Sequence, residues 1–200
     1  MKIIIISGPS GSGKTTLSEK ISKKTKNSII LSTDNYYKSG RKSKLLSKII
    51  DCYFDRLISF NFNLLDRDLK FILSNRFINH SYSYDFKNKS IKKNIKKIKN
   101  IKMVIVEGIF AREIIEKYSK EINLIVQLIP NKETCLKRVI ERDYSERGKD
   151  KIKAYKDFSK GWELFHKIKK KKDYQNLVKN ILVQEKSDPN LILKIINEKN

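Results

Sequence analysis

Short runs of consecutive apolar residues alternate with longer segments in which apolar residues recur every three or four positions. The short runs predict buried strands at residues 3–6, 28–32, 103–106, 123–128 and 181–183. The longer segments predict helices at residues 16–21, 43–58, 63–74, 111–120, 132–143, 151–172 and 190–198. This alternation indicates an α/β fold, a three-layer sandwich with helices on both faces of a central parallel sheet. The 200 residues suit a single domain, because no repeat, linker or boundary interrupts the pattern.

Residues 76–89 follow neither pattern. They are polar and aromatic, so we expect a hairpin-like excursion, over about residues 76–102, that covers the substrate. Within it, isoleucines at positions 91, 95, 98 and 101 have a spacing that suits a helix. The residues alone do not decide between a helix and a strand there.

The segment between the first strand and the first helix carries the strongest motif of the chain. Residues 8–15 fit the P-loop pattern G-x-x-x-x-G-K-[ST], with a strand before it and a helix after it. Glycines let the backbone N–H groups point at a polyphosphate, and the helix N-terminus adds partial positive charge. Lys14 would reach the β- and γ-phosphates, and the Thr15 hydroxyl would bind Mg²⁺. We therefore expect ATP or GTP to bind at Gly8, Pro9, Ser10, Gly11, Ser12, Gly13, Lys14, Thr15 and Thr16.

Two acidic residues directly follow predicted strands. Asp34 lies just beyond residues 28–32, and Glu107 directly follows residues 103–106. Ligands of open parallel sheets bind at this edge, so both side chains are expected to face the P-loop crevice. Asp34 would either contact the metal or accept a proton from an attacking hydroxyl, unless it only caps a helix. Glu107 stands where P-loop enzymes hold the magnesium shell.

Three arginines lie within ten residues near the end of the predicted helix at 132–143. Arg138 and Arg142 are four residues apart and share one helix face, and Arg147 lies in the charged turn that follows. In a phosphate-binding protein they predict a lid, over about residues 138–150, that clamps the transferring phosphoryl group. The alternative is a solvated helix face. In the next helix, an apolar stripe at residues 158, 162, 165 and 168 predicts core packing rather than a base-binding surface.

The formal net charge of +23 admits two interpretations. Clustered lysines and arginines are typical of nucleic-acid binders, whereas a lysine-rich composition can also be spread over solvated faces. The basic stretches do not interleave aromatic residues as a base-stacking surface does, so a nucleic-acid partner is not expected. No apolar run is long enough for a membrane span, and two cysteines without metal-ligand spacing suit a reducing cytoplasm. The oligomeric state stays open, a homo-oligomer included.

Four motifs in this order resemble the uridine kinase family of P-loop nucleoside kinases. They are the P-loop at residues 8–15, Ser-Thr-Asp-Asn-Tyr-Tyr-Lys at 32–38, Val-Glu-Gly-Ile-Phe-Ala at 106–111, and Arg142-Asp143 followed by Glu-Arg-Gly-Lys at 146–149. The resemblance implies a P-loop NTPase fold and a strand within residues 91–101. It implies Asp34 as general base, Tyr37 and Arg138 in the acceptor site, Asp55 on ribose hydroxyls, Tyr84 near the base, Glu107 at Mg²⁺, and Arg142 and Arg147 in the lid.

The chain also departs from the family pattern. The family's Phe-Asp-x-Pro segment lacks its proline here, and the histidine that follows the Tyr-Asp-Phe hairpin is absent. We therefore expect an ATP- and magnesium-dependent kinase whose acceptor is a small molecule. The resemblance favours the 5′-hydroxyl of uridine or cytidine and a cytoplasmic role in pyrimidine salvage. Pantothenate, ribulose phosphate and nicotinamide riboside stay open, and an NTP-driven nucleic-acid-binding protein is the alternative from another class.

Overall fold

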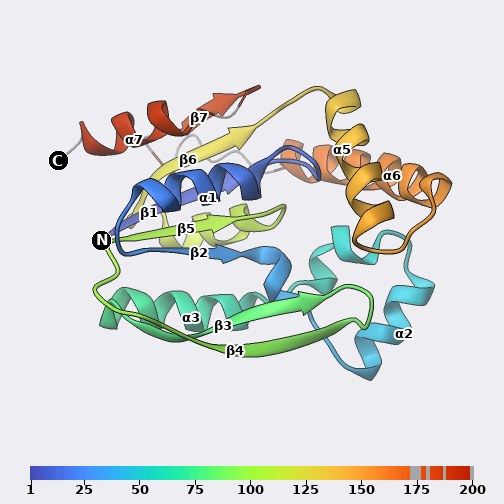
Figure 1. The fold of residues 1–200 in the computed structure, drawn as a ribbon, viewed down its shortest axis with the longest axis horizontal. Helices are drawn as coiled ribbons and strands as arrows, with labels where there is room; N and C mark the ends of the chain where they lie inside the picture. The colour runs from blue at the N-terminus through green and yellow to red at the C-terminus, as the bar shows by residue number, and fades with distance from the viewer. Residues whose placement is uncertain (172–176, 179–180, 187, 199–200) are drawn as a thin grey trace.

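A five-stranded parallel sheet forms the centre of the computed structural model, which describes residues 1–171, 177–178, 181–186 and 188–198 (Figure 1). The strand order is β2-β5-β1-β6-β7. The strands are β1 Lys2–Ser7, β2 Ser28–Ser32, β5 Met103–Glu107, β6 Ile122–Leu128 and β7 Ile181–Gln184, all paired in parallel. The predicted parallel sheet is confirmed, because buried parallel strands are continuous apolar runs that a sequence shows directly.

Helices cover both faces of this sheet, because successive strand residues point to opposite sides. Ile4 and Ile6 pack with the apolar residues of α1 (Lys14–Lys24) and α7 (Pro189–Asn197). Ile3 and Ile5 pack instead with α3 (Phe62–Asn75), α4 (Ile115–Tyr118) and the 3₁₀ turn η4 (Ala111–Ile114). Each of these isoleucines is fully buried, which stabilises the fold by about 1.5–3 kcal/mol per side chain relative to exposure.

A two-stranded hairpin, β3 (Ile78–Asp85) and β4 (Ser90–Ile98), runs alongside α3 and is separate from the main sheet. The strands are antiparallel, with Tyr84 opposite Ile91. The hairpin prediction is confirmed and the helical spacing at residues 91–101 is misleading. Ile95 is 90% exposed, so those isoleucines do not mark one buried face.

The helix predicted over residues 43–58 is wrong in its second half. Helix α2 covers only Arg41–Ile49, and two short 3₁₀ turns follow, η2 (Tyr53–Asp55) and η3 (Leu57–Ser59). The chain leaves helical geometry at Ile50, which is extended, and Cys52 has a left-handed backbone with φ of 51°. Apolar residues in this segment therefore pack in several directions.

Helices α5 (Lys132–Ser145) and α6 (Lys151–Lys171) lie together beyond the carboxyl ends of the strands (Figure 1). The Asn131 side chain caps α5 by accepting a hydrogen bond from the Thr134 amide at 2.8 Å. Residue 172 and the side chain of Ile168, both part of the predicted helix at 151–172, lie outside the described part. The predicted helix at 111–120 is shorter, because η4 and α4 replace it.

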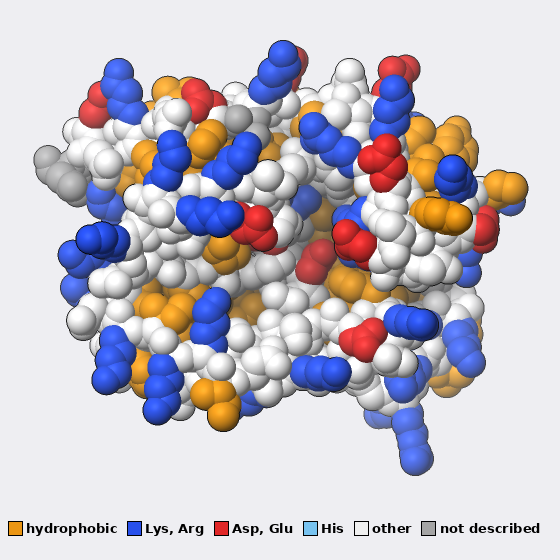
Figure 2. Space-filling model, in the orientation of Figure 1, with side chains coloured by type: hydrophobic (Ala, Val, Ile, Leu, Met, Phe, Trp, Pro, Cys, Tyr) orange, Lys and Arg blue, Asp and Glu red, His pale blue; other side chains and the backbone are white. Residues whose placement is uncertain are grey.

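Lysine and arginine side chains are spread over the whole face of the molecule drawn in Figure 2. This distribution favours the solvated-surface interpretation of the charge for that face, since nucleic-acid binders gather their cations in a patch or groove. In the described part of the chain, none of the helices combines the length and the apolar content that crossing a bilayer requires.

Candidate active site

The loop of residues 8–13 joins β1 to α1 and places backbone N–H groups at the first turn of that helix. Gly11 has φ of 77°, and a Cβ there would lie 2.4 Å from the Cys135 carbonyl oxygen. Only glycine satisfies both the left-handed backbone and this close approach to α5. The P-loop backbone is thus held directly against the helix that carries the three arginines.

Lys14 begins α1 and is buried beneath the loop. Its ammonium donates hydrogen bonds to the Pro9 carbonyl oxygen at 2.8 Å and to the Ser12 hydroxyl at 3.4 Å. Burial lowers the pKa of Lys14, although the carboxylates of Glu107 and Asp34 oppose this effect. These two oxygen atoms hold the Lys14 ammonium inside the loop, next to the position where P-loop enzymes bind polyphosphate oxygens.

Glu107 ends β5 as a buried carboxylate beside the P-loop. The Thr15 hydroxyl donates to its Oε1 at 3.4 Å. Burial raises the pKa of Glu107, and the nearby Asp34 adds to the rise. The following Gly108 has φ of 136°, and a Cβ there would lie 1.8 Å from the Thr33 hydroxyl oxygen. A glycine is therefore required where the β5 and β2 ends meet.

The oxygen atoms of Thr15 and Glu107 lie together beside the P-loop, where a magnesium ion would bind. The described residues contain no group of three or more His, Cys, Asp or Glu side chains that could bind a metal by themselves. Mg²⁺ typically keeps several waters and takes its other ligands from one or two carboxylates and from substrate phosphates. One hydroxyl and one carboxylate next to a P-loop fit such an ion.

Asp34 lies in the 3₁₀ turn η1 (Thr33–Tyr36) that directly follows β2. It lines the same cavity as Lys14 and Glu107, as the strand-edge argument predicted. Tyr37 also lines it, and its hydroxyl donates to the Phe54 carbonyl oxygen at 2.9 Å. The Tyr37 ring packs edge-on against Phe54, which fixes the backbone next to Asp34.

Asp55 lies in the 3₁₀ turn η2 and faces the same cavity. Burial, together with the negative charges of Asp34 and Asp157, raises the pKa of Asp55 to about 6. Gly161 of α6 lies directly against it, because a Cβ at Gly161 would be 3.1 Å from the Asp55 carboxylate. Asp55 is therefore a confined carboxylate that would accept hydrogen bonds from an acceptor molecule.

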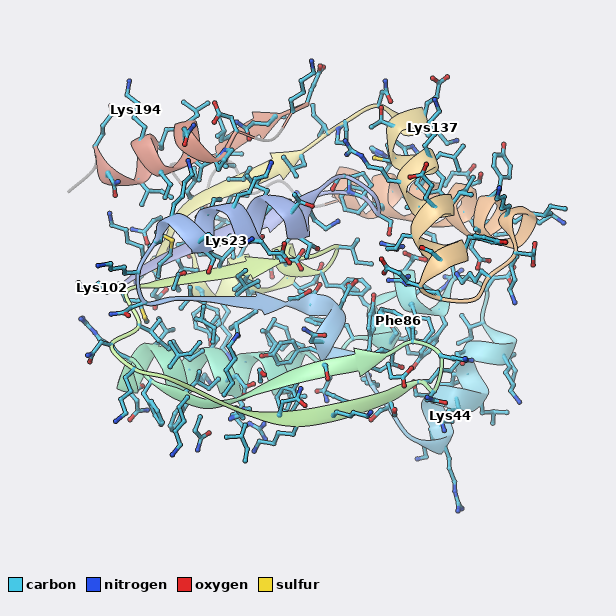
Figure 3. All side chains as sticks on the ribbon, in the orientation of Figure 1. Lys23, Lys44, Phe86, Lys102, Lys137 and Lys194 are labelled. Atoms are coloured by element: carbon cyan, nitrogen blue, oxygen red, sulfur yellow. The ribbon has the colours of Figure 1, made fainter. Side chains whose placement is uncertain are left out.

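The structure places Tyr84 and Phe86 differently from the expectation for this hairpin. Tyr84 is buried in an aromatic cluster with Tyr37 and Phe54, and it is not among the residues that line the cavity. Phe86 does line the cavity, and it lies between the hairpin turn and α5 (Figure 3). Of these two rings of the hairpin, the one that faces the cavity is thus Phe86, two residues further along the chain.

The three predicted lid arginines all line this cavity. Arg138 donates to the Gly11 carbonyl oxygen at 3.2 Å. Arg142 and Arg147 both contact the carboxylate of Asp143. The Arg147 guanidinium also lies 3.9 Å from the centre of the Phe86 ring. The arginines therefore bridge the P-loop on one side and the hairpin turn on the other.

The cavity that joins these groups has a volume of about 700 Å³. Of the predicted P-loop residues, Ser10, Gly11, Gly13, Lys14, Thr15 and Thr16 line it, while Gly8, Pro9 and Ser12 support the loop from behind. Sequence reasoning missed the wall that α6 provides, which includes Lys153, Asp157, Phe158, Gly161 and Trp162. The aromatic stripe was the available signal. Phe158 does pack against Cys135 and Val139 as predicted, but it also faces the cavity.

Comparison with known proteins matches this chain to one family. The family model described as "Phosphoribulokinase / Uridine kinase family" matches residues 3–186. A uridine kinase of Borrelia hermsii is 38% identical over 149 residues, which are 74% of this chain and 70% of that protein. A uridine kinase of Borreliella burgdorferi is 34% identical over 181 residues, covering 88% and 85%.

A solved structure from Bacillus stearothermophilus, described as a possible uridine kinase, superposes with a TM-score of 0.56. It shares 14% sequence identity and covers 90% of this chain and 88% of its own, so this likeness bears on the fold alone. The sequence relatives and the family model carry the assignment. The chain belongs to the phosphoribulokinase/uridine kinase family and is an ATP-dependent kinase that acts on small molecules.

Proposed function

We propose that this chain transfers the γ-phosphoryl group of Mg·ATP to the 5′-hydroxyl of uridine or cytidine. The observation that carries the proposal is that the P-loop, Asp34 and Asp55 line one cavity. A nucleoside kinase needs a loop that binds phosphates, a proton acceptor and a group that binds ribose hydroxyls. The P-loop, Asp34 and Asp55 suit these three tasks respectively. The uridine kinase relatives support the choice of acceptor. The proposal also implies a cytoplasmic role in pyrimidine salvage.

Asp34 is the proton acceptor in this mechanism. Its position at the end of β2, facing the P-loop crevice, allows the acceptor hydroxyl to lie between its carboxylate and the γ-phosphate. The hydroxyl proton passes to the Asp34 carboxylate as the hydroxyl oxygen bonds to phosphorus, and the bond to the β-phosphate oxygen breaks. Because phosphoryl transfer has a loose transition state, Asp34 acts mainly by orienting the hydroxyl early and taking its proton late.

Positive charge meets the transferring group from two sides. Lys14 turns from the Pro9 carbonyl oxygen toward the β- and γ-phosphates, while Arg142 and Arg147 approach from the lid. Thr15 and Glu107 would hold Mg²⁺, which supplies further charge neutralisation at the phosphates when bound. Fixed charges in a confined cavity stabilise the transition state without the reorganisation that water requires.

Asp55 is the group proposed to select a ribose. An ionised carboxylate accepts several hydrogen bonds, which suits two neighbouring hydroxyls. Several aromatic rings, Phe86 among them, line the same cavity, and such rings suit a planar base. A neutral acceptor with vicinal hydroxyls and a planar ring therefore satisfies more of the lining than a simple alcohol does.

A second class of acceptor is favoured by one further observation. Lys48, Lys89 and Lys153 line the same cavity, so an acceptor with a carboxylate or phosphate would also find cations there. Pantothenate and ribulose phosphate have such groups, and nicotinamide riboside does not. A nucleic-acid-stimulated ATPase would draw on the +23 charge instead.

The deciding experiment measures acceptor-dependent ADP release with uridine, cytidine, pantothenate, ribulose phosphate, nicotinamide riboside and single-stranded RNA, and identifies each product. We expect nucleoside 5′-monophosphates. Phosphorylation of an anionic acceptor alone, or RNA-stimulated hydrolysis without any phosphorylated acceptor, would exclude the proposal. Asp34→Asn should lower transfer by about 10²-fold or more while ATP affinity is kept, which is the usual scale for acid–base catalysis. A parallel loss of ATP affinity would make Asp34 a metal ligand or a helix cap instead.

A further inference from the structure

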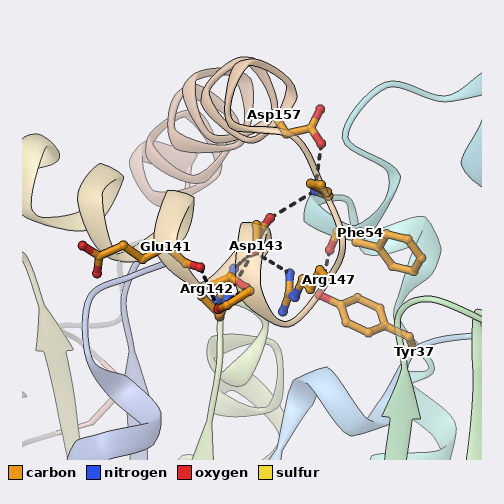
Figure 4. Close-up of polar contacts among 9 residues, drawn as sticks. Tyr37, Phe54, Glu141, Arg142, Asp143, Arg147 and Asp157 are labelled. Carbon is orange, nitrogen blue, oxygen red and sulfur yellow. Dashed lines mark hydrogen bonds and ion pairs between the residues drawn. The ribbon is translucent and has the colours of Figure 1, made fainter.

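Asp143 is the most heavily paired carboxylate next to the active-site cavity, and the phosphoryl-transfer chemistry does not use it. It lies near the end of α5 with its side chain only 4% exposed. Its Oδ1 accepts from Arg142 Nε at 3.0 Å and from Arg142 Nη2 at 2.7 Å. Arg147 Nη1 lies 3.5 Å from the same oxygen, and Lys149 Nζ lies 3.2 Å from Oδ2. Three cations of the lid thus converge on one carboxylate (Figure 4).

The Arg142 contact is one that helix geometry does not provide by itself. Neighbouring residues of a helix point in different directions, so the Arg142 side chain must fold back around the helix end to reach Asp143. Two of its five N–H donors are used there, and the others stay available to a phosphate. The pairing therefore fixes the guanidinium without exhausting it.

Charge balance shows that the cluster still favours an anion. Burial opposes the negative charge of Asp143, but Arg142, Arg147 and Lys149 together hold the pKa of Asp143 below its ordinary value. Arg142, Arg147 and Lys149 outnumber the two carboxylates that they contact, so the cluster beside the P-loop stays net positive. A phosphoryl group that gains negative charge in the transition state would be stabilised by it.

The cluster also ties the lid to α6. Lys149 Nζ lies 2.8 Å from Asp157 Oδ2, so one ammonium bridges Asp143 of α5 and Asp157 of α6. One helical turn beyond Asp157, Gly161 lies against Asp55. The turn that carries Arg147 is thereby fixed at both of its ends.

We propose that Asp143 is a positioning residue that holds the guanidinium groups of Arg142 and Arg147 in the orientation required for phosphoryl transfer. A free arginine side chain has many rotamers. If the lid arginines had to be immobilised during the catalytic step, the loss of rotamer entropy would slow that step by about 30-fold for each arginine. Because Asp143 already holds the arginines in the folded protein, this entropy is lost during folding and not during the catalytic step. The opposite role, in which Asp143 withholds the arginines from the phosphates, predicts faster transfer once its charge is removed.

The test is Asp143→Asn, which keeps the shape and removes the charge. Its matched control is Glu141→Gln, which removes the same charge from an exposed position two residues earlier on α5. We expect Asp143→Asn to lower kcat by about 10- to 100-fold, the range for one hydrogen-bond partner of a charged group. ATP affinity and the KM for acceptor should change little, and Glu141→Gln should behave as the wild type. An unchanged or raised kcat, or a loss seen only as higher KM, would overturn the inference.

A second comparison separates positioning from general loosening of the fold. In an Arg142→Ala/Arg147→Ala background, Asp143→Asn should have almost no additional effect on kcat, because the groups that it positions are gone. A full additional loss would show that Asp143 acts through the fold and would refute the inference. If Asp143→Asn does not fold, Asp143→Glu decides, since it keeps the charge but moves the carboxylate by one methylene. It must then lower kcat while leaving ATP affinity unchanged.

The inference rests on the proposed function only for the identity of the acceptor. Acceptor-independent ATP hydrolysis uses the same P-loop and lid, so it is measured beside nucleoside phosphorylation. A wild type that phosphorylates no nucleoside would refute the proposed function, while the effect of Asp143→Asn on hydrolysis would still decide the role of Asp143. Nucleoside phosphorylation that is unaffected by Asp143→Asn would refute this inference alone.

Discussion

Replacing Asp55 by asparagine should make the folded protein more stable and the enzyme inactive. The carboxyl group has a pKa of about 6 in the folded chain, against an ordinary value of 3.8, because it is buried near Asp34. At about 1.4 kcal/mol for each tenfold change, this difference corresponds to about 3 kcal/mol at neutral pH. One side of Asp55 is open to the cavity, where water screens part of the charge, so we expect Asp55→Asn to raise the free energy of unfolding by about 1–3 kcal/mol.

The sign of the pH dependence follows from proton counting. Well below pH 3.8 both the folded and the unfolded chain hold the Asp55 proton, so this group makes no difference. Between that pH and about 6 the folded chain holds more protons than the unfolded chain, so stability falls as pH rises. Above about pH 6 the destabilisation is complete. The gain from Asp55→Asn should therefore be present at pH 7.5 and absent near pH 3.5.

Urea unfolding at both pH values, with Asp51→Asn as the control, measures this effect. Asp51 is an exposed aspartate four residues earlier that pairs with Lys160. Its replacement should not produce a gain that appears only at the higher pH. In the same preparations, Asp55→Asn should lose nucleoside phosphorylation while it keeps ATP binding. A loss of stability at pH 7.5, or an equal gain at both pH values, would refute the argument that Asp55 is a confined charge.

Four further substitutions test the phosphate side of the site. Lys14→Ala should nearly abolish turnover and leave the circular dichroism spectrum unchanged, because Lys14 acts on charge that develops at the phosphoryl group; near-normal activity would contradict the P-loop assignment. Arg142→Ala and Arg147→Ala should each lower kcat, by up to about 10³-fold, more than they raise the KM for acceptor; unchanged kcat in both would make them a solvated helix face. Glu107→Gln should raise the Mg²⁺ concentration needed for half-maximal activity, and an unchanged requirement would remove Glu107 from the metal site.

The nucleotide half of the site could be predicted because its parts are local in sequence. The P-loop depends on a strand, a turn and a helix start within about fifteen residues. Asp34 and Glu107 directly follow parallel strands, and the carboxyl ends of parallel strands meet at one edge. The buried strands were predicted within about two residues for the same reason, since each is a short, continuous apolar run.

The acceptor half could not be predicted in this way, because long-range packing assembles it. Only the family resemblance predicted a role for Asp55, which lies on a segment that the apolar pattern predicted to be helical. The backbone at Cys52 is left-handed, which an apolar pattern does not reveal. Gly161, more than one hundred residues later, closes over Asp55, and nothing in the α6 sequence distinguishes it from an ordinary helix glycine. Tyr84 was expected near the base, but its ring faces the aromatic cluster, and Phe86, for which no role was predicted, faces the cavity.

This division of the site bears on how the acceptor should be sought. The sheet holds the P-loop, Asp34 and Glu107, so these groups keep their geometry whatever small molecule the kinase accepts. The acceptor wall comes from η2, the hairpin turn and α6, which lie outside the sheet and can differ without disturbing the core. The departures from the family pattern also fall in that wall, at the missing proline near Asp55 and the missing histidine after Phe86. Variants at Asp55, Phe86 and Gly161 will therefore discriminate between acceptors, whereas variants at Lys14 or Glu107 will affect all of them alike.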